Sequence, residues 1–340
     1  MSYKIPALPS PKAYLEEKAD FWEIQSILNS GQFISQMNIT KSFAYGLDEM
    51  QHDGIESEED TLEFNLESVY QELIDRRKSC YAGYPFEFGH ASIKFNESRE
   101  YKRDMYLYLL LCTRFNMNTQ KMQNGIDATL LFEEICAEVA RNHFGKNSEC
   151  LIFGTATPGN FEAKIRDLAI KLGEGEGYKN PNQNYPTKND DGIDVVVWKN
   201  FADFREGKLI GFAQCKTGTN WRDLIHKLKP RDFCDNWLVN NPVLSPIPMI
   251  FLCDTLHYEQ NFITDQRGFL IFNRFRIMEY LPDRLDAGLY RKVQQWLQGA
   301  LNSLAKNSLH THFARFATQK ECFVQKEKER IKLLGWPVKI

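Results

Sequence analysis

The stretch GIDVVVWKNFADFREGKLIGFAQCK, residues 192–216, decides the fold expected of this chain. Two apolar runs within it, 193–198 and 209–216, have the length and composition of β-strands. The polar residues 199–208 between them suit the loop of a long hairpin. We therefore predict two neighbouring strands that are joined by this loop.

Polar side chains gather at one end of the predicted hairpin. Because side chains along a strand point to alternate faces, Gln214 and Lys216 should project to one side of the sheet and Cys215 to the other. Asp194 is the only charged residue in the first strand, and it stands at the beginning of that strand. If the two strands pair, a carboxylate, an amide and an ammonium group converge at one edge of the sheet.

This combination of groups suits a site for a metal ion and a phosphate. Mg²⁺ prefers hard oxygen donors, and it binds through one or two carboxylates and substrate phosphate while keeping several waters. A neighbouring lysine can orient the attacking water and offset the charge that grows on the phosphate oxygens. A structural alternative stays open for each residue alone: Asp194 can cap a turn, and Lys216 can reach water from a strand end.

The segments around the hairpin predict an α/β chain. Apolar residues recur at helical spacing before and after it, and other short apolar runs have strand character. Helices are expected at 11–28, 62–77, 99–115, 128–144, 221–229 and 283–304. Further strands are expected at 84–95, 248–253 and 268–272. Pro230 is expected to end the helix of 221–229, and the acidic residues 48–60 are expected to form a loop.

Composition favours an ordinary globular protein. The chain has 340 residues, of which 43% are hydrophobic and 26% charged, so one large domain or two packed domains can bury a core. The net charge of -3 means that any binding of phosphates must come from a local patch. The longest apolar run, 105–112, is too short to span a bilayer, and residues 1–11 resemble neither a signal peptide nor an anchor. We expect a cytoplasmic protein that does not bind membranes.

The cysteines predict reduced thiols and exclude a zinc site of ordinary spacing. They are scattered singly, form no C-x-x-C pair and often stand in apolar surroundings. Such cysteines are typical of an intracellular protein. They are Cys80, Cys112, Cys136, Cys150, Cys215, Cys234, Cys253 and Cys322.

Taken together, the motifs resemble those of the PD-(D/E)XK nuclease superfamily in its Mrr-like branch. The pair FE at 132–133 lies on the helix before the hairpin, the triplet GID at 192–194 opens the first strand, and the triplet QCK at 214–216 closes the second. Members of that branch carry such motifs in this order. The resemblance covers residues 131–254, and it departs from the superfamily pattern in that no proline precedes Asp194.

The resemblance implies a restriction-endonuclease-like core, in which helices flank a mixed central sheet in the order αβββαβ. We expect that core at 121–282, an N-terminal α/β module for recognition or regulation at 1–120, and a C-terminal helical extension at 283–340.

The resemblance also assigns roles to four residues. Glu133 and Asp194 would hold a metal, Gln214 would occupy a ligand position that is usually acidic, and Lys216 would be the catalytic lysine. The implied cofactor is Mg²⁺, which Mn²⁺ can replace. A helix with exposed glutamates is ordinary, so the role of Glu133 has alternatives. Glu134 adjoins Glu133 on the helix, and Glu138 is the fallback ligand. Asp190 and Asp191 are expected to cap the loop before the first strand, where either could also touch a metal-bound water.

The function implied is that of an Mg²⁺-dependent endonuclease that hydrolyses phosphodiester bonds in DNA, in bacterial anti-phage defence or restriction. The alternative is a nuclease-fold module that no longer cuts and instead binds DNA or a partner protein as a structural subunit of a defence complex. The neutral Gln214 makes this alternative conceivable, because it removes one carboxylate from the metal's shell. Besides DNA, the expected partners are a second copy of the chain or another subunit of the same system.

A basic cluster follows the second strand directly. Its residues could follow the backbone of a nucleic acid, although a solvated helix face explains them equally well. They are Arg222, Lys227, Lys229 and Arg231.

Overall fold

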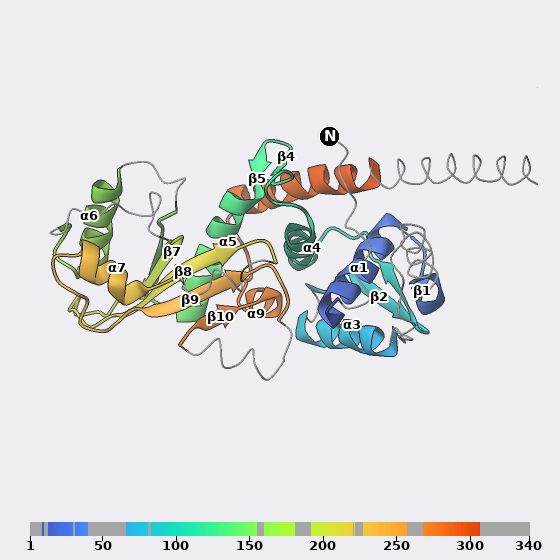
Figure 1. Ribbon diagram of the computed structural model, residues 1–340, viewed down its shortest axis with the longest axis horizontal. Coiled ribbons are helices and arrows are strands. Elements are labelled where there is room, and N and C mark those ends of the chain that lie inside the picture. Colours follow the sequence, from blue (N-terminus) through green and yellow to red (C-terminus); the bar gives the residue numbers. More distant parts are fainter. Residues whose placement is uncertain are drawn as a thin grey trace, which may run out of the picture.

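The computed structural model describes residues 9, 13–29, 31–39, 66–80, 83–154, 160–180, 192–219, 221, 227–256 and 268–306. It shows an α/β fold in which helices flank a mixed sheet of five strands (Figure 1). The expected loop at 48–60 lies outside the described residues, as do Asp190, Asp191, Arg222 and Cys322. Within the described part, no helix combines the length and the apolar character needed to cross a membrane.

The central sheet has the strand order β10-β9-β8-β7-β6. Its strands are β6 (Ser148–Ile152), β7 (Val195–Lys199), β8 (Leu209–Lys216), β9 (Ile247–Leu252) and β10 (Leu270–Phe272). Neighbours are antiparallel from β6 to β8 and parallel from β8 to β10. The predicted hairpin is confirmed, because β7 and β8 pair from Val195 opposite Ala213 to Lys199 opposite Leu209.

Helices cover both faces of this sheet. The helices α5 (Ala128–Phe144) and α9 (Arg274–Glu279) pack on the face that includes Val195 and Ala213. The helices α6 (Phe161–Leu172) and α7 (Pro230–Trp237) pack on the face that includes Val196 and Phe212. Both faces are therefore buried, which explains why the strand residues 195–198 form a continuous apolar run.

Local signals explain where α5 begins and ends. The side chain of Asp127 accepts a hydrogen bond from the Thr129 amide and caps the first turn, and Gly145 follows the helix with a φ of 80°. The prediction of a helix at 128–144 is confirmed at both ends. Residues such as Phe132 and Val139 bury its apolar face.

Two elements of the core, β6 and α6, are absent from the elements predicted from the sequence. The signals for α6 are present: Asn160 caps the helix by accepting from the Ala163 amide, and Gly173 ends it in the left-handed conformation. The buried residues Phe161, Ile165 and Leu168 also have helical spacing.

The helix predicted for 221–229, with Pro230 as its end, is wrong in its described part. Residues 227–229 are not α-helical, and Pro230 is the first residue of α7. Proline has no backbone N–H and a φ suited to helices, so it is favoured in the first turn, where that N–H has no partner within the helix.

The described residues before α5 include a small sheet of order β1-β3-β2 and a pair of short strands, β4 and β5. Their bounds, with those of three helices, are α1 (Leu15–Leu28), β1 (Ile34–Ser35), α3 (Leu66–Cys80), β2 (Phe86–Gly89), β3 (Ser92–Phe95), α4 (Tyr101–Arg114), β4 (Met122–Gln123) and β5 (Ile126–Asp127), and residues 36–39 are also helical. The single strand expected at 84–95 is a hairpin, because the chain turns at Ala91, whose φ is 46°. Near the other end of the chain, residues 287–306 are helical.

The N-terminal elements share one hydrophobic core with the central sheet. Trp22 of α1, Leu109 of α4 and Trp296 of the helix at 287–306 belong to the buried cluster that also contains Phe132 and Val195. The domain boundaries at 120 and 282 stay predictions.

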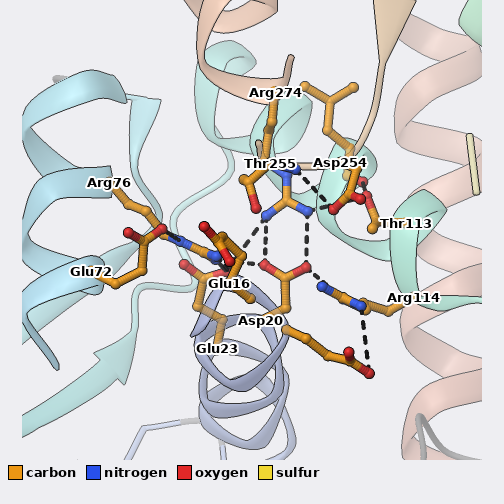
Figure 2. Close-up of polar contacts among 12 residues, drawn as sticks. Glu16, Asp20, Glu23, Glu72, Arg76, Thr113, Arg114, Asp254, Thr255 and Arg274 are labelled. Atoms are coloured by element: carbon orange, nitrogen blue, oxygen red, sulfur yellow. Dashed lines mark hydrogen bonds and ion pairs between the residues drawn. The ribbon is translucent and has the colours of Figure 1, made fainter. Parts of the chain in front are cut away.

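Buried charges join four helical elements (Figure 2). The carboxylate of Asp20 on α1 accepts from Arg76 at 2.5 Å, from Arg114 at 2.6 Å and from Arg274 at 2.8 and 3.1 Å. Burial alone would raise the pKa of Asp20, but the guanidinium groups of Arg114, Arg274 and Arg76 hold it well below its ordinary value. We call Asp20 and these three arginines the buried charge cluster.

Candidate functional site

The hairpin brings Asp194, Gln214 and Lys216 to one end of the sheet. The register that pairs Val195 with Ala213 sets Asp194 opposite Gln214, and the Asp194 amide donates to the Ala213 carbonyl at 2.9 Å. Paired residues point to the same face, and so do residues two apart along a strand. The three side chains therefore belong to the face that carries Phe212, under α6 and α7.

The carboxylate of Asp194 bonds to β8. One of its oxygens accepts a hydrogen bond from the Cys215 amide at 2.7 Å. A capping role within its own turn does not describe this contact, because the donor lies on the neighbouring strand. The bond places the carboxylate beside the peptide that joins Gln214 to Cys215.

Gln214 carries an acceptor that the described protein does not satisfy. Its side chain is 5% exposed, and its Oε1 has no hydrogen-bond partner among the described residues. A buried acceptor left unsatisfied costs about 1–3 kcal/mol, so it calls for a ligand. Gly192 lies beside this amide with a φ of 84°, which favours glycine, and a Cβ at this position would be in ordinary contact with Nε2 of Gln214 at 3.6 Å.

Glu133 approaches the same end of the sheet from α5. It is 9% exposed, and its carboxylate packs against Gly154, so closely that a Cβ on Gly154 would lie 2.3 Å from Oε2 of Glu133. The Gly154 amide donates to the Asp194 carbonyl at 3.1 Å. Gly154, two residues after the end of β6, therefore contacts both Glu133 and Asp194.

The other two glutamates of α5 have partners elsewhere. Glu134 forms an ion pair with Lys292 at 2.7 Å, and Glu138 pairs with Arg141 one turn further along the helix. Glu133 is the one whose carboxylate lies against Gly154, after β6.

Three of the candidate residues influence the thiol of Cys215, which lies between β8 and α5. Burial raises its pKa, a hydrogen bond with the Cys136 thiol lowers it, the carboxylates of Asp194 and Glu133 raise it further, and Lys216 lowers it. All three charges therefore act on one side chain. The raised pKa keeps Cys215 a neutral thiol, which makes it a packing residue between β8 and α5.

The other described cysteines agree with the expected reduced thiols. All seven described cysteines, Cys215 included, are free, and five of them are buried. Burial raises the pKa of Cys150 to about 11 and the pKa of Cys80 and Cys234 to about 12.

Hydrogen bonds to backbone carbonyls connect Arg274 of the buried charge cluster to the end of β8. Arg274 donates from Nε to the Cys253 carbonyl and from its amide to the Asp254 carbonyl, each at 3.0 Å. The Cys253 amide in turn donates to the Lys216 carbonyl at 3.2 Å. Arg274 thereby fixes the strand end next to Lys216, and the sequence analysis did not identify this role.

The candidate site offers oxygen atoms as possible ligands for a metal ion. Among the described residues, no group of three His, Cys, Asp or Glu side chains is arranged to hold one. Glu133 and Asp194 supply two carboxylates, and the third oxygen at this place is the unsatisfied amide oxygen of Gln214. Two carboxylates and an amide oxygen, completed by water and substrate, fit the hard oxygen ligands of Mg²⁺.

The basic cluster after β8 is partly neutralised in its described part. Lys229 lies 3.7 Å from Asp232, and Arg231 lies 4.0 Å from Asp235. These pairs favour a solvated helix face for the two residues. Lys227 is exposed.

Sequence reasoning missed Gly154 and Lys164, which border the site. A signal existed for Lys164, because it interrupts the apolar stripe of α6 between Phe161 and Leu168. A lysine inside such a stripe is buried only when its ammonium group has partners.

Comparison with known proteins adds no assignment. No protein-family model, no curated protein and no solved structure matches this chain.

Proposed function

We propose that the protein is an Mg²⁺-dependent endonuclease that hydrolyses phosphodiester bonds in DNA. The observation that carries this proposal is the placement of two carboxylates, an unsatisfied buried amide oxygen and a lysine at one end of the sheet. Carboxylates hold a metal, and a lysine beside them stabilises negative charge on a phosphate.

The order of elements supports a restriction-endonuclease-like core. The chain passes from α5 through β6, β7 and β8 to α7 and β9, with three antiparallel strands followed by a parallel one. This is the αβββαβ order, to which α6 is added between β6 and β7 and β10 at the edge of the sheet.

The chain's own residues divide the work of the reaction. Glu133, Asp194 and Gln214 would hold Mg²⁺, which when bound supplies a Lewis acid and lowers the pKa of its water. The ammonium group of Lys216 would orient the attacking water and donate to a phosphate oxygen. The neutral amide of Gln214 lowers the negative charge of the site and so reduces its repulsion of the substrate phosphate.

Cleavage assays test this proposal directly. Purified protein is incubated with plasmid, linear duplex DNA, single-stranded DNA and single-stranded RNA, with and without Mg²⁺. We expect cleavage of DNA that needs Mg²⁺ or Mn²⁺ and stops with a chelator. Folded protein that cuts none of these polymers with either metal contradicts the proposal, and cleavage of RNA alone changes the substrate class.

The second candidate function is a binding module without catalysis, which is conceivable because the neutral Gln214 stands at a ligand position that is usually acidic. Calorimetric titration with Mg²⁺ separates the two. An enzyme should take up Mg²⁺, and Asp194→Asn should weaken this uptake by more than about 10-fold, because it removes a charged ligand. A binding module should show no uptake that depends on Asp194. The matched control is Asp203→Asn in the exposed loop between β7 and β8.

A methyl group at position 154 should displace Glu133. Gly154→Ala puts a Cβ where Oε2 of Glu133 now lies, and the flexible end of that side chain can move away. We expect a folded protein whose affinity for Mg²⁺ falls by about 10- to 100-fold, as when the support of a metal ligand is removed. Calorimetry with thermal unfolding checks this, and unchanged affinity would separate Glu133 from the metal site.

A role in bacterial anti-phage defence or restriction rests on the resemblance of the motifs. A second copy of the chain or another subunit of such a system is the partner that this role implies.

A further inference from the structure

We infer that Lys164 is a positioning residue that holds Glu133 and Asp194 in register, an inference that rests on the proposed function. Lys164 lies near the start of α6 and is 5% exposed. Lysine is rarely buried, because taking an ammonium group out of water is costly unless hydrogen bonds compensate. The hydrogen-bond partners of the Lys164 ammonium group should therefore explain why this lysine is buried.

The ammonium group bonds the segment that follows β6. Nζ of Lys164 donates to the Gly154 carbonyl at 2.9 Å and to the Phe153 carbonyl at 3.4 Å. It also lies 5.8 Å from the centre of the Phe153 ring, within reach of a cation–π interaction. A single side chain of α6 thus holds two successive peptide groups.

Phe153 and Gly154 together contact both candidate acids, Asp194 and Glu133. The amides of Phe153 and Gly154 donate to the Asp194 carbonyl at 2.8 and 3.1 Å. Gly154 also lies against the carboxylate of Glu133, because a Cβ added to Gly154 would be 2.3 Å from Oε2 of Glu133. Phe153 and Gly154 therefore form a bridge between Glu133 on α5 and Asp194 at the entry to β7, and we call these two residues the acid bridge.

Lys164 holds this bridge from the face opposite to Glu133. The helix α6 packs on one face of the sheet and α5 on the other, so the bridge is fixed from both sides. Metal ligands must be held to within about 0.5 Å for full affinity, and such precision depends on residues that support the ligands. Without the ammonium group, two carbonyls lose their donor and the bridge can shift.

Lys164→Met tests this inference, and Lys171→Met on the same helix is the matched control. Met has a similar length but no donor. Lys171 is exposed and pairs with Asp167 at 2.7 Å, so its loss should change little. Lys164→Gln, which keeps a donor without the charge, is measured in parallel in case Lys164→Met does not fold.

The first measurement is amide hydrogen exchange in the protein without metal. For Lys164→Met we expect faster exchange at Phe153 and Gly154, by about 10-fold or more, with unchanged exchange in the second half of α6. Faster exchange along the whole of α6 would mean that Lys164 merely anchors the helix, and this would overturn the inference. Unchanged exchange at the acid bridge would overturn it as well.

The second measurement is the dependence of cleavage on Mg²⁺ concentration. We expect the concentration for half-maximal cleavage to rise by about 10- to 100-fold in Lys164→Met, with the KM for DNA unchanged and activity restored by saturating Mg²⁺. A loss that Mg²⁺ does not restore indicates a structural role and contradicts the inference. If the wild-type protein does not cleave, the proposed function fails, and the exchange data still decide whether Lys164 holds the acid bridge.

Discussion

Lys216→Ala is expected to lower kcat for Mg²⁺-dependent cleavage of plasmid DNA by about 100- to 1000-fold, the usual cost of losing a group that stabilises transition-state charge. The fold should persist, because the contacts of position 216 within the sheet are made by its backbone, whose carbonyl accepts from the Cys253 amide at 3.2 Å. Binding of DNA without metal should change little. Rates of plasmid nicking at saturating Mg²⁺ provide the measurement.

The matched control for this change is Lys146→Ala. Lys146 is exposed between α5 and β6, near the opposite end of the sheet, so its loss removes the same charge without touching the end that carries Lys216. It should cleave at nearly the wild-type rate. Wild-type cleavage by Lys216→Ala would remove this lysine from the mechanism, whatever the control shows.

Asp20→Ala is expected to lower the free energy of unfolding by about 3–5 kcal/mol or more, the usual effect of removing one partner of a buried ion pair. The carboxylate is fully buried and bonds three guanidinium groups, those of Arg76, Arg114 and Arg274 (Figure 2). Without it, positive charge is left in the core without its main partner. Chemical denaturation monitored by fluorescence measures the difference.

Asp75→Ala provides the comparison for Asp20→Ala. Asp75 lies on α3 and pairs with Lys78 at 2.7 Å on the surface, where exposed pairs contribute about 0–1 kcal/mol. The two variants remove the same carboxylate from very different surroundings. If they unfold at the same denaturant concentration, the buried charge cluster does not stabilise the fold.

The hairpin and the helix before it could be predicted because their signals are local. The bounds of α5 and of β8 match the predicted ranges. Helical periodicity, a capping aspartate and a following glycine mark α5, and a run of strand residues after a polar loop marks β8. The register of β7 and β8 then places Asp194, Gln214 and Lys216 on one face by alternation alone.

Other features could not be predicted from local patterns. Three glutamates stand on α5, and the sequence does not say which of them packs against Gly154 after β6. Pro230 was interpreted as a helix end because proline breaks helices, although it also suits the first turn of one. In both cases the distinction depends on what packs against the residue.

By itself, the sequence determined the helix at 128–144 and the hairpin at 193–216, and which side chains of the hairpin share a face, because hydrogen bonding and side-chain alternation within a strand or helix depend on neighbours in the chain. The tertiary structure alone decided that Asp20 meets Arg274, 254 residues away, and that Lys164 reaches the Gly154 carbonyl. Such contacts arise when helices and strands pack together, and the free energy that selects them is a sum over the whole core, which no single stretch of sequence records.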